Sequence, residues 1–129
     1  MSNRLPFLYI QDVKGKGKSV FTAQVIPKGS SIEICPTILL GSADCATIHD
    51  TKLHDYYFLW GTSGDGAIAL GFGSIYNHSS QANADYEMLL KEELISIIAI
   101  RDIEAGEEIT INYMDNGEQK SVLWFEEID

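Results

Sequence analysis

Residues 76–83 have the sequence Tyr76-Asn77-His78-Ser79-Ser80-Gln81-Ala82-Asn83, a run of hydrogen-bonding side chains between two largely apolar segments. About thirty residues later, residues 106–113 read Gly106-Glu107-Glu108-Ile109-Thr110-Ile111-Asn112-Tyr113, which again join polar side chains to an apolar strand. A polar group that is buried without a partner costs about 1–3 kcal/mol. Polar side chains at this density therefore need partners, and a bound ligand could supply them.

A third segment carries closely spaced glycines. It runs Gly15-Lys16-Gly17-Lys18-Ser19-Val20-Phe21-Thr22-Ala23 and is followed by Ile26-Pro27-Lys28-Gly29. Taken in order, the three segments resemble the signature motifs of the SET-domain protein lysine methyltransferases. Those motifs are an opening G-x-G-x-G-V-F-A strand with its I-P-K-G turn, then N-H-S-x-x-P-N, then G-E-E-[LI]-T-x-x-Y. The resemblance covers residues 15–113, and the shared order of three motifs makes it specific.

The length of 129 residues leaves room for one domain, and 45% hydrophobic residues favour a globular chain. We therefore expect a single SET domain over residues 1–129, of the compact type without a pre-SET segment or a Cys-rich tail. No apolar run reaches the roughly 18 residues of a membrane span, and the N-terminus lacks a signal-peptide pattern. An intracellular protein, in cytoplasm or on chromatin or a nucleoid, is expected. Cys35 and Cys45 are expected to stay reduced.

Short β-rich runs separated by Gly, Pro and polar turns predict a mainly β fold. Strands are expected at 8–10, 19–26, 31–35, 67–72, 86–90, 94–100 and 109–113. The one helical insert is expected over 46–55 with Thr47 as its N-cap, and residues 91–93 should form a hairpin turn. The SET resemblance implies a β-clip of small sheets with a C-terminal pseudoknot.

The chain also contains an internal echo at a spacing of 77 residues. Ile26-x-x-Gly29-x-x-Ile32-x-Ile34 corresponds to Ile103-x-x-Gly106-x-x-Ile109-x-Ile111. Each copy reads as a glycine turn followed by an alternating strand, which fits small sheets folded back on one another.

Charge is unevenly distributed. Residues 1–30 hold five basic side chains and one acidic one, a net charge of +4. Because the whole chain has a net charge of −10, the other 99 residues have a net charge of −14. An acidic surface repels nucleic-acid phosphates, which argues against direct nucleic-acid binding. It suits a basic, lysine-rich protein partner.

The resemblance implies S-adenosylmethionine as the methyl donor and assigns it to the first two motifs. Gly15 and Gly17 would let the backbone approach the cofactor, while Lys16 and Lys18 could offset its carboxylate. Asn77 and His78 would bond its adenine and amino-acid ends, and a neutral imidazole suits a cationic sulfonium.

The remaining polar residues of the second motif have supporting roles. Asn83 would brace the loop through backbone hydrogen bonds, although a plain turn asparagine is nearly as good a description. Ala82 replaces the usual proline, which leaves the loop less restrained. Ser80 stands where many eukaryotic members have a zinc-binding cysteine, so we expect the site to close without zinc.

Tyr113 is the expected catalytic residue and is also expected to line the cofactor site, since the matching tyrosine of the family lies beside the methyl-transfer path. Orienting the amine suits it better than acting as a base, because a phenol with a pKa near 10 is barely ionised at neutral pH. Tyr57, Tyr76, Ile111 and Trp124 are candidates for the lysine channel. Ile111 replaces a Phe or Tyr that limits the number of methyl groups, and residues 122–125 could form an apolar lid or simply pack on the core.

Other functions are weaker. Gly17-Lys18-Ser19 ends like a phosphate-binding loop, but the required glycine five positions before Gly17 is Asp12. A zinc site from Cys45, His49 and His54 has awkward spacing for one helix face. A catalytically silent SET fold that binds basic proteins or acts as a scaffold remains the second hypothesis, and a homodimer is conceivable.

Overall fold

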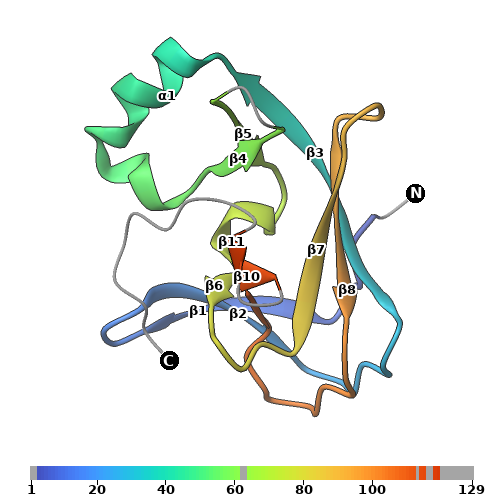
Figure 1. Ribbon diagram of the computed structural model, residues 1–129. Helices are drawn as coiled ribbons and strands as arrows, with labels where there is room; N and C mark the ends of the chain where they lie inside the picture. The colour runs from blue at the N-terminus through green and yellow to red at the C-terminus, as the bar shows by residue number, and fades with distance from the viewer. Residues whose placement is uncertain (1–2, 62–63, 113, 116–117, 120–129) are drawn as a thin grey trace.

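The computed structural model describes residues 3–61, 64–112, 114–115 and 118–119 (Figure 1). A seven-stranded sheet has the order β4-β5-β3-β8-β7-β9-β6, and β1–β2 and β10–β11 form two-stranded sheets. The strands are β1 Leu8–Val13, β2 Gly17–Thr22, β3 Ser31–Leu40, β4 Phe58–Trp60, β5 Asp65–Ala69, β6 Asn77–His78, β7 Ala84–Leu89, β8 Leu94–Ala99, β9 Thr110–Ile111, β10 Met114–Asp115 and β11 Glu118–Gln119. The helices are α1 Ser42–His49 and two 3-10 turns, η1 Lys52–Asp55 and η2 Gly73–Ile75. The prediction of a mainly β fold is confirmed.

The helical insert lies earlier in the chain than predicted. α1 begins after Gly41, and Thr47 is an interior residue whose hydroxyl donates to the Ala43 carbonyl at 3.2 Å. The predicted N-cap at Thr47 is therefore wrong, and Thr51 instead caps η1 by accepting from the Leu53 amide at 3.1 Å. A threonine hydroxyl bonds local backbone groups both inside a helix and at its start, so its presence alone does not fix a boundary.

The predicted hairpin turn is confirmed, because β7 and β8 are antiparallel and Leu89 pairs with Leu94. The short strands β4 and β6 were not predicted. β4 lies in an aromatic run without alternation, and β6 consists of the two polar residues Asn77 and His78. Their strand geometry comes from pairing with β5 and β9, which local sequence does not encode.

The two copies of the internal echo pair with each other through equivalent backbone hydrogen bonds. Ile26 and Ile103 exchange backbone hydrogen bonds of 2.8 and 2.9 Å. The Gly29 amide donates to the Ala99 carbonyl, and the corresponding Gly106 amide donates to that of Thr22. Both glycines have φ near +90°, at 88° and 86°. The strand that follows the first glycine turn, β3, therefore pairs with β8, which precedes the second copy. The strand that follows the second turn lies beside β2, which precedes the first copy.

The connection between β6 and β7 crosses over β9. β9 lies between these two strands and runs parallel to both, with Asn77 opposite Thr110 and Ala84 opposite Ile111. Residues 79–83 must therefore pass over the segment that carries β9. This arrangement agrees with the threaded C-terminal segment that the SET resemblance implies.

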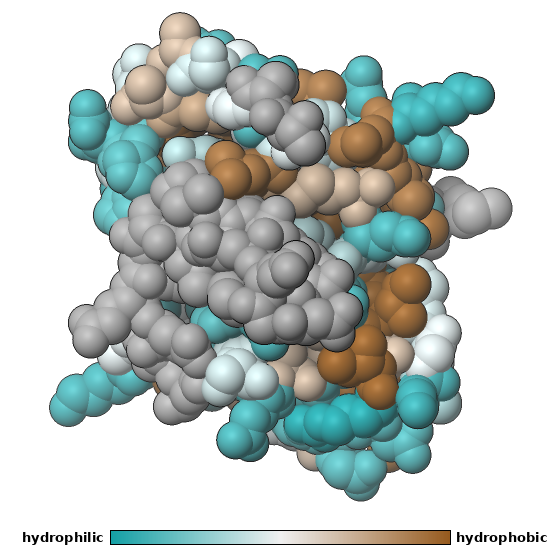
Figure 2. All heavy atoms as spheres, viewed as in Figure 1, coloured by the Kyte–Doolittle hydropathy of each residue, from teal (hydrophilic) through white to brown (hydrophobic). Residues whose placement is uncertain are grey.

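The core is continuous and rich in isoleucine. Its fully buried members include Ile26, Ile95, Ile97, Ile103 and Ile109, each with no exposed surface. Hydrophobic side chains also remain on the surface where β3, β7 and β8 run, as Figure 2 shows, and Ile38 and Leu90 are half exposed. Cys35 and Cys45 are buried free thiols, as predicted. None of the helices in the described part of the chain has the length and hydropathy that crossing a membrane requires.

Replacing Ile103 by alanine should destabilise the fold by about 2–5 kcal/mol, because the side chain is fully buried where the two echo copies meet. Urea unfolding followed by circular dichroism would measure the loss. Ile100→Ala is the matched control, since Ile100 is 47% exposed and should change stability by less than about 1 kcal/mol. Equal losses in the two variants would contradict the described core.

Candidate active site

The fold brings the three motifs to one place. β2, which begins in the first motif, lies beside the third: Phe21 bridges Glu108, and the Ile109 amide donates to the Val20 carbonyl at 2.8 Å. The third motif continues into β9, which pairs with β6 and so with Asn77 and His78 of the second. Segments that lie about 90 and about 30 residues apart in the sequence thus become neighbours in the fold.

A polar network joins side chains from all three motifs. The Asn77 amide nitrogen donates to the Ser19 hydroxyl and to Glu108 Oε2, both at 2.8 Å. Glu108 Oε1 accepts a hydrogen bond from Lys16 Nζ at 3.0 Å, and the Ser19 hydroxyl donates in turn to the Gly17 carbonyl at 3.3 Å. Lys16 and Glu108 are 19% and 16% exposed, so this ion pair is less screened by water than a surface pair.

These contacts fix what Asn77 can offer a ligand. Only the amide NH₂ can donate to the Glu108 carboxylate, and both of its hydrogens are used by Glu108 and Ser19. The remaining polar atom, Oδ1, is an acceptor. Asn77 can therefore offer a ligand a hydrogen-bond acceptor but no further donor.

The two glycines of the first motif lie at the β1–β2 turn. Gly15 and Gly17 have φ of 87° and 85°, a region that favours glycine. A Cβ built at either position would meet no heavy atom within 4 Å, so the backbone is open on that side. Lys18 pairs with Asp12 at 3.7 Å, while Lys16 is tied to Glu108 and still has other ammonium hydrogens to donate. Open backbone beside a cation suits a ligand with a carboxylate.

His78 and Ile111 lie side by side in the parallel pair of β6 and β9. His78 is 3% exposed and Ile111 has no exposed surface, and the Ser79 amide donates to the Ile111 carbonyl at 3.0 Å. The register therefore holds the second motif against the apolar strand of the third. The predicted roles of both side chains stay predictions.

Asn83 ties the second motif to the third. Its amide donates to the Glu108 carbonyl at 2.7 Å, and its Oδ1 accepts from the Thr110 amide at 2.9 Å. Asn83 is 1% exposed, so these bonds satisfy a buried amide. Asn83 bonds backbone groups, as predicted, but these groups belong to the third motif, 25 or more residues away, and not to its own loop.

Glu107 supports the same junction from outside. It accepts from the Glu104 amide at 2.9 Å, from Arg101 at 2.8 Å and from Asn83 at 3.2 Å. Burial by itself would raise the pKa of Glu107, but these hydrogen bonds and the Arg101 charge together lower it. The ionised carboxylate is thus the form that the fold favours.

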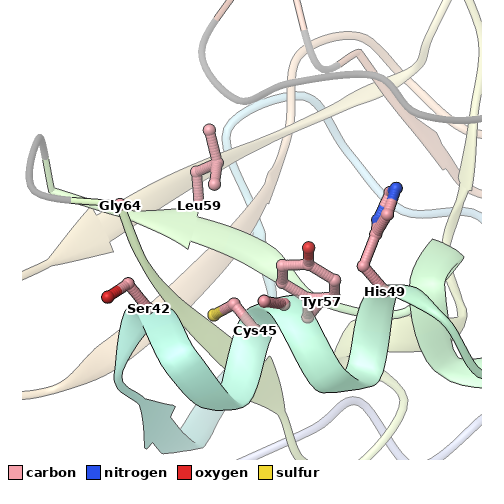
Figure 3. Close-up of a pocket in the computed structure, with 7 residues that line it drawn as sticks. Ser42, Cys45, His49, Tyr57, Leu59 and Gly64 are labelled. Carbon is pink, nitrogen blue, oxygen red and sulfur yellow. The ribbon is translucent and has the colours of Figure 1, made fainter.

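Two of the predicted channel residues, Tyr76 and Tyr57, are buried, and their roles in a lysine channel stay predictions. Tyr76 is 2% exposed and its hydroxyl donates to Glu33 Oε1 at 2.7 Å. Tyr57 is 8% exposed and lines a cavity of about 360 Å³ beside α1 and β4, with Cys45, His49 and Leu59. Figure 3 shows these side chains facing the space from both elements. Burial raises the pKa of Tyr57, so its hydroxyl stays protonated at neutral pH.

The other predicted residues lie outside the described part of the chain. These are Tyr113, expected to be catalytic, and Trp124, together with the rest of residues 122–125. Their roles stay predictions. Among the residues that are described, no group of three or more His, Cys, Asp or Glu could hold a metal ion. His49 and His54 instead make an edge-to-face ring contact at 5.7 Å, so the zinc alternative gains no support.

Ser19 and Glu108 belong to the site although sequence reasoning gave them no role. Both stand inside the motifs, and a buried hydroxyl or carboxylate beside a motif asparagine is a usable signal. Which of the two neighbouring glutamates, Glu107 or Glu108, faces Asn77 depends on the strand pairing. That pairing is a tertiary feature.

Glu107→Gln should reduce stability at neutral pH and matter less in acid. The pKa of Glu107 is lower in the folded protein than its ordinary value of 4.5, so the ionised side chain stabilises the fold. This stabilisation is complete above pH 4.5 and is lost as the pH falls through the pKa of the folded protein. Thermal unfolding between pH 3 and 7 should therefore show the gap between wild type and variant closing below pH 4.5. Glu92→Gln, on the exposed hairpin turn, controls for loss of one negative charge. A gap that widens in acid would contradict the assignment.

Comparisons with known proteins agree with this geometry. The SET domain family model matches residues 17–114. A Schizosaccharomyces pombe protein named histone-lysine N-methyltransferase, H3 lysine-37 specific, is 32% identical over 121 residues, which is 93% of this chain and 78% of that protein. The crystal structure of a Plasmodium falciparum candidate histone methyltransferase superposes with a TM-score of 0.66 at 29% identity, covering 84% of this chain and 94% of that one. The family match over residues 17–114 and the 32% identical relative show that this chain belongs to the SET-domain family of protein lysine methyltransferases.

Proposed function

We propose that this protein transfers methyl groups from S-adenosylmethionine to the ε-amine of lysine in a basic protein substrate. The observation that carries the proposal is the network of Lys16, Ser19, Asn77 and Glu108, which joins the three motifs at one site. The name of the S. pombe relative supports lysine as the target and a histone-like protein as the substrate class.

The chain's own residues suit the cofactor from two sides. Asn77 Oδ1 would accept a hydrogen bond from an amino or ammonium group, and Lys16 would face a carboxylate across the open backbone of Gly15 and Gly17. His78, in the same strand as Asn77, would add main-chain hydrogen bonds. The bound cofactor would supply a methyl group on a sulfonium, which is the electrophile of an in-line displacement. No metal ion is required for that displacement.

The lysine must lose a proton before it can react, because its free pKa is about 10.4. An apolar channel that ends at a cationic sulfonium lowers this pKa by desolvation and by like-charge repulsion, so water can accept the proton. The Tyr113 hydroxyl would orient the amine rather than take its proton. Ile111, which carries no hydroxyl, would leave room for more than one methyl group.

The charge distribution supports a basic protein as the substrate. A body of net charge −14 outside the first 30 residues attracts a lysine-rich tail and speeds its association at low salt. The second hypothesis is a catalytically silent SET fold that binds basic proteins. It predicts that a basic protein is bound without any transfer of methyl groups.

S-adenosylmethionine should bind the purified protein, and Asn77→Ala should weaken that binding by about tenfold because a hydrogen-bond acceptor is lost. Isothermal titration would measure both dissociation constants. Asn3→Ala is the matched control at an exposed asparagine and should leave the affinity unchanged. No heat of binding at millimolar cofactor, with the protein folded, would contradict the cofactor assignment.

Tyr113→Phe should keep cofactor affinity within about twofold but lower kcat by about a hundredfold, the usual cost of removing a preorganised hydroxyl donor. Transfer of labelled methyl groups to a lysine-rich histone-type peptide would measure it. Tyr9→Phe, at a tyrosine that is 38% exposed, controls for the substitution itself. Binding of the peptide by wild-type protein without methylation would favour the scaffold hypothesis.

A further inference from the structure

A buried carboxylate lies directly behind the segment that leads into Asn77. Glu33, on β3, is 3% exposed and belongs to none of the three motifs. The register shift in β3 between Ser31 and Glu33 places both Ile32 and Glu33 in the interior. Burying a charge is costly unless it is paired and hydrogen-bonded, so this position calls for an explanation.

The Glu33 carboxylate holds both ends of η2. Its Oε2 accepts from the Phe72 amide at 3.1 Å, and its Oε1 accepts from the Tyr76 hydroxyl at 2.7 Å. Phe72 and Tyr76 flank Gly73–Ile75, and Tyr76 is bonded directly to Asn77 in the chain. Fixing these two ends fixes the direction in which the backbone reaches β6.

The approach of this segment is close. Gly71 has φ of 68°, and a Cβ there would collide with the Glu33 carboxylate. A Cβ at Gly73 would lie 2.5 Å from the Ala69 Cβ and 2.8 Å from Cys35 Sγ. Both glycines are therefore needed for the turn to seat on β3. Close packing of this kind leaves few alternative positions for the turn.

Arg4 completes the arrangement from the N-terminal segment. Its Nη1 lies 3.3 Å from Glu33 Oε2, and its guanidinium carbon lies 3.8 Å from the centre of the Phe72 ring. Backbone bonds from Leu5 to Ile32 and from Ile34 to Asn3 hold that segment beside β3. Arg4 thus offsets the buried charge and covers the turn at once.

We propose that Glu33 is a positioning residue of the cofactor site, which sets the placement of Asn77 and His78 by clamping Phe72 and Tyr76. This inference rests on the proposed function, since it concerns the same site. Glu33 touches neither cofactor nor substrate in this role. Its effect passes through the Tyr76 hydroxyl and the Phe72 amide to the strand that carries Asn77.

Tyr76→Phe and Glu33→Gln should each weaken S-adenosylmethionine binding by about tenfold, because each breaks a hydrogen bond of the buried carboxylate. The double variant should bind S-adenosylmethionine with nearly the same affinity as the single variant that binds less tightly, since both changes disrupt one clamp. Tyr86→Phe is the matched control, a buried core tyrosine on β7, and should leave affinity within twofold. Additive losses, or losses equal to that of the control, would overturn the proposal.

Hydrogen exchange gives a second readout that does not need the cofactor. The amides of residues 72–79 should exchange faster in Tyr76→Phe than in wild type, and Tyr86→Phe should leave the exchange rates of these amides unchanged. If wild type binds no cofactor, the proposed function fails, while faster exchange at 72–79 still supports the clamp. Unchanged exchange in Tyr76→Phe would overturn it.

Discussion

The pairing of residues 103–111 with two distant parts of the chain is the constraint on which the rest of the structure depends. On one side this segment bonds β2 through Thr22 and Val20, and on the other β9 lies between β6 and β7. Both glycine turns of the echo serve this pairing, because each directs a strand back along the other copy. The backbone of the third motif thereby becomes the common neighbour of the first two.

The polar groups at this junction form a hydrogen-bonded set rather than a loose cluster. Asn83 bonds backbone on β9, Asn77 bonds Ser19 and Glu108, and Glu108 holds Lys16. In a partly buried setting such bonds are stronger than in water, and breaking one leaves a costly unpaired group. These bonds consequently hold the Asn77 acceptor and the Lys16 ammonium in place. Preorganisation of this kind would lower the cost of binding the proposed cofactor.

The mainly β character could be predicted from sequence because alternating Ile, Val and Tyr residues favour a half-buried strand wherever it pairs. The hairpin between β7 and β8 followed from charged residues between two apolar runs. The start of α1 could not be predicted in this way, because Ser42 and Thr47 are both acceptable at a helix start. The strand at Asn77–His78 is polar and only two residues long, so it exists through its partners in β9.

The sequence by itself determined the family, the three motifs and most candidate residues. Each motif is a short run of specific side chains at fixed spacings, so it can be identified without the structure. Only the tertiary structure decided which side chains meet. It selected Glu108 as the partner of Asn77, and Glu107 as a support outside the junction. It also placed Tyr76 on a buried Glu33 that no motif contains. The physical reason is that a strand's register fixes the face of every side chain, and register depends on partners far away in sequence.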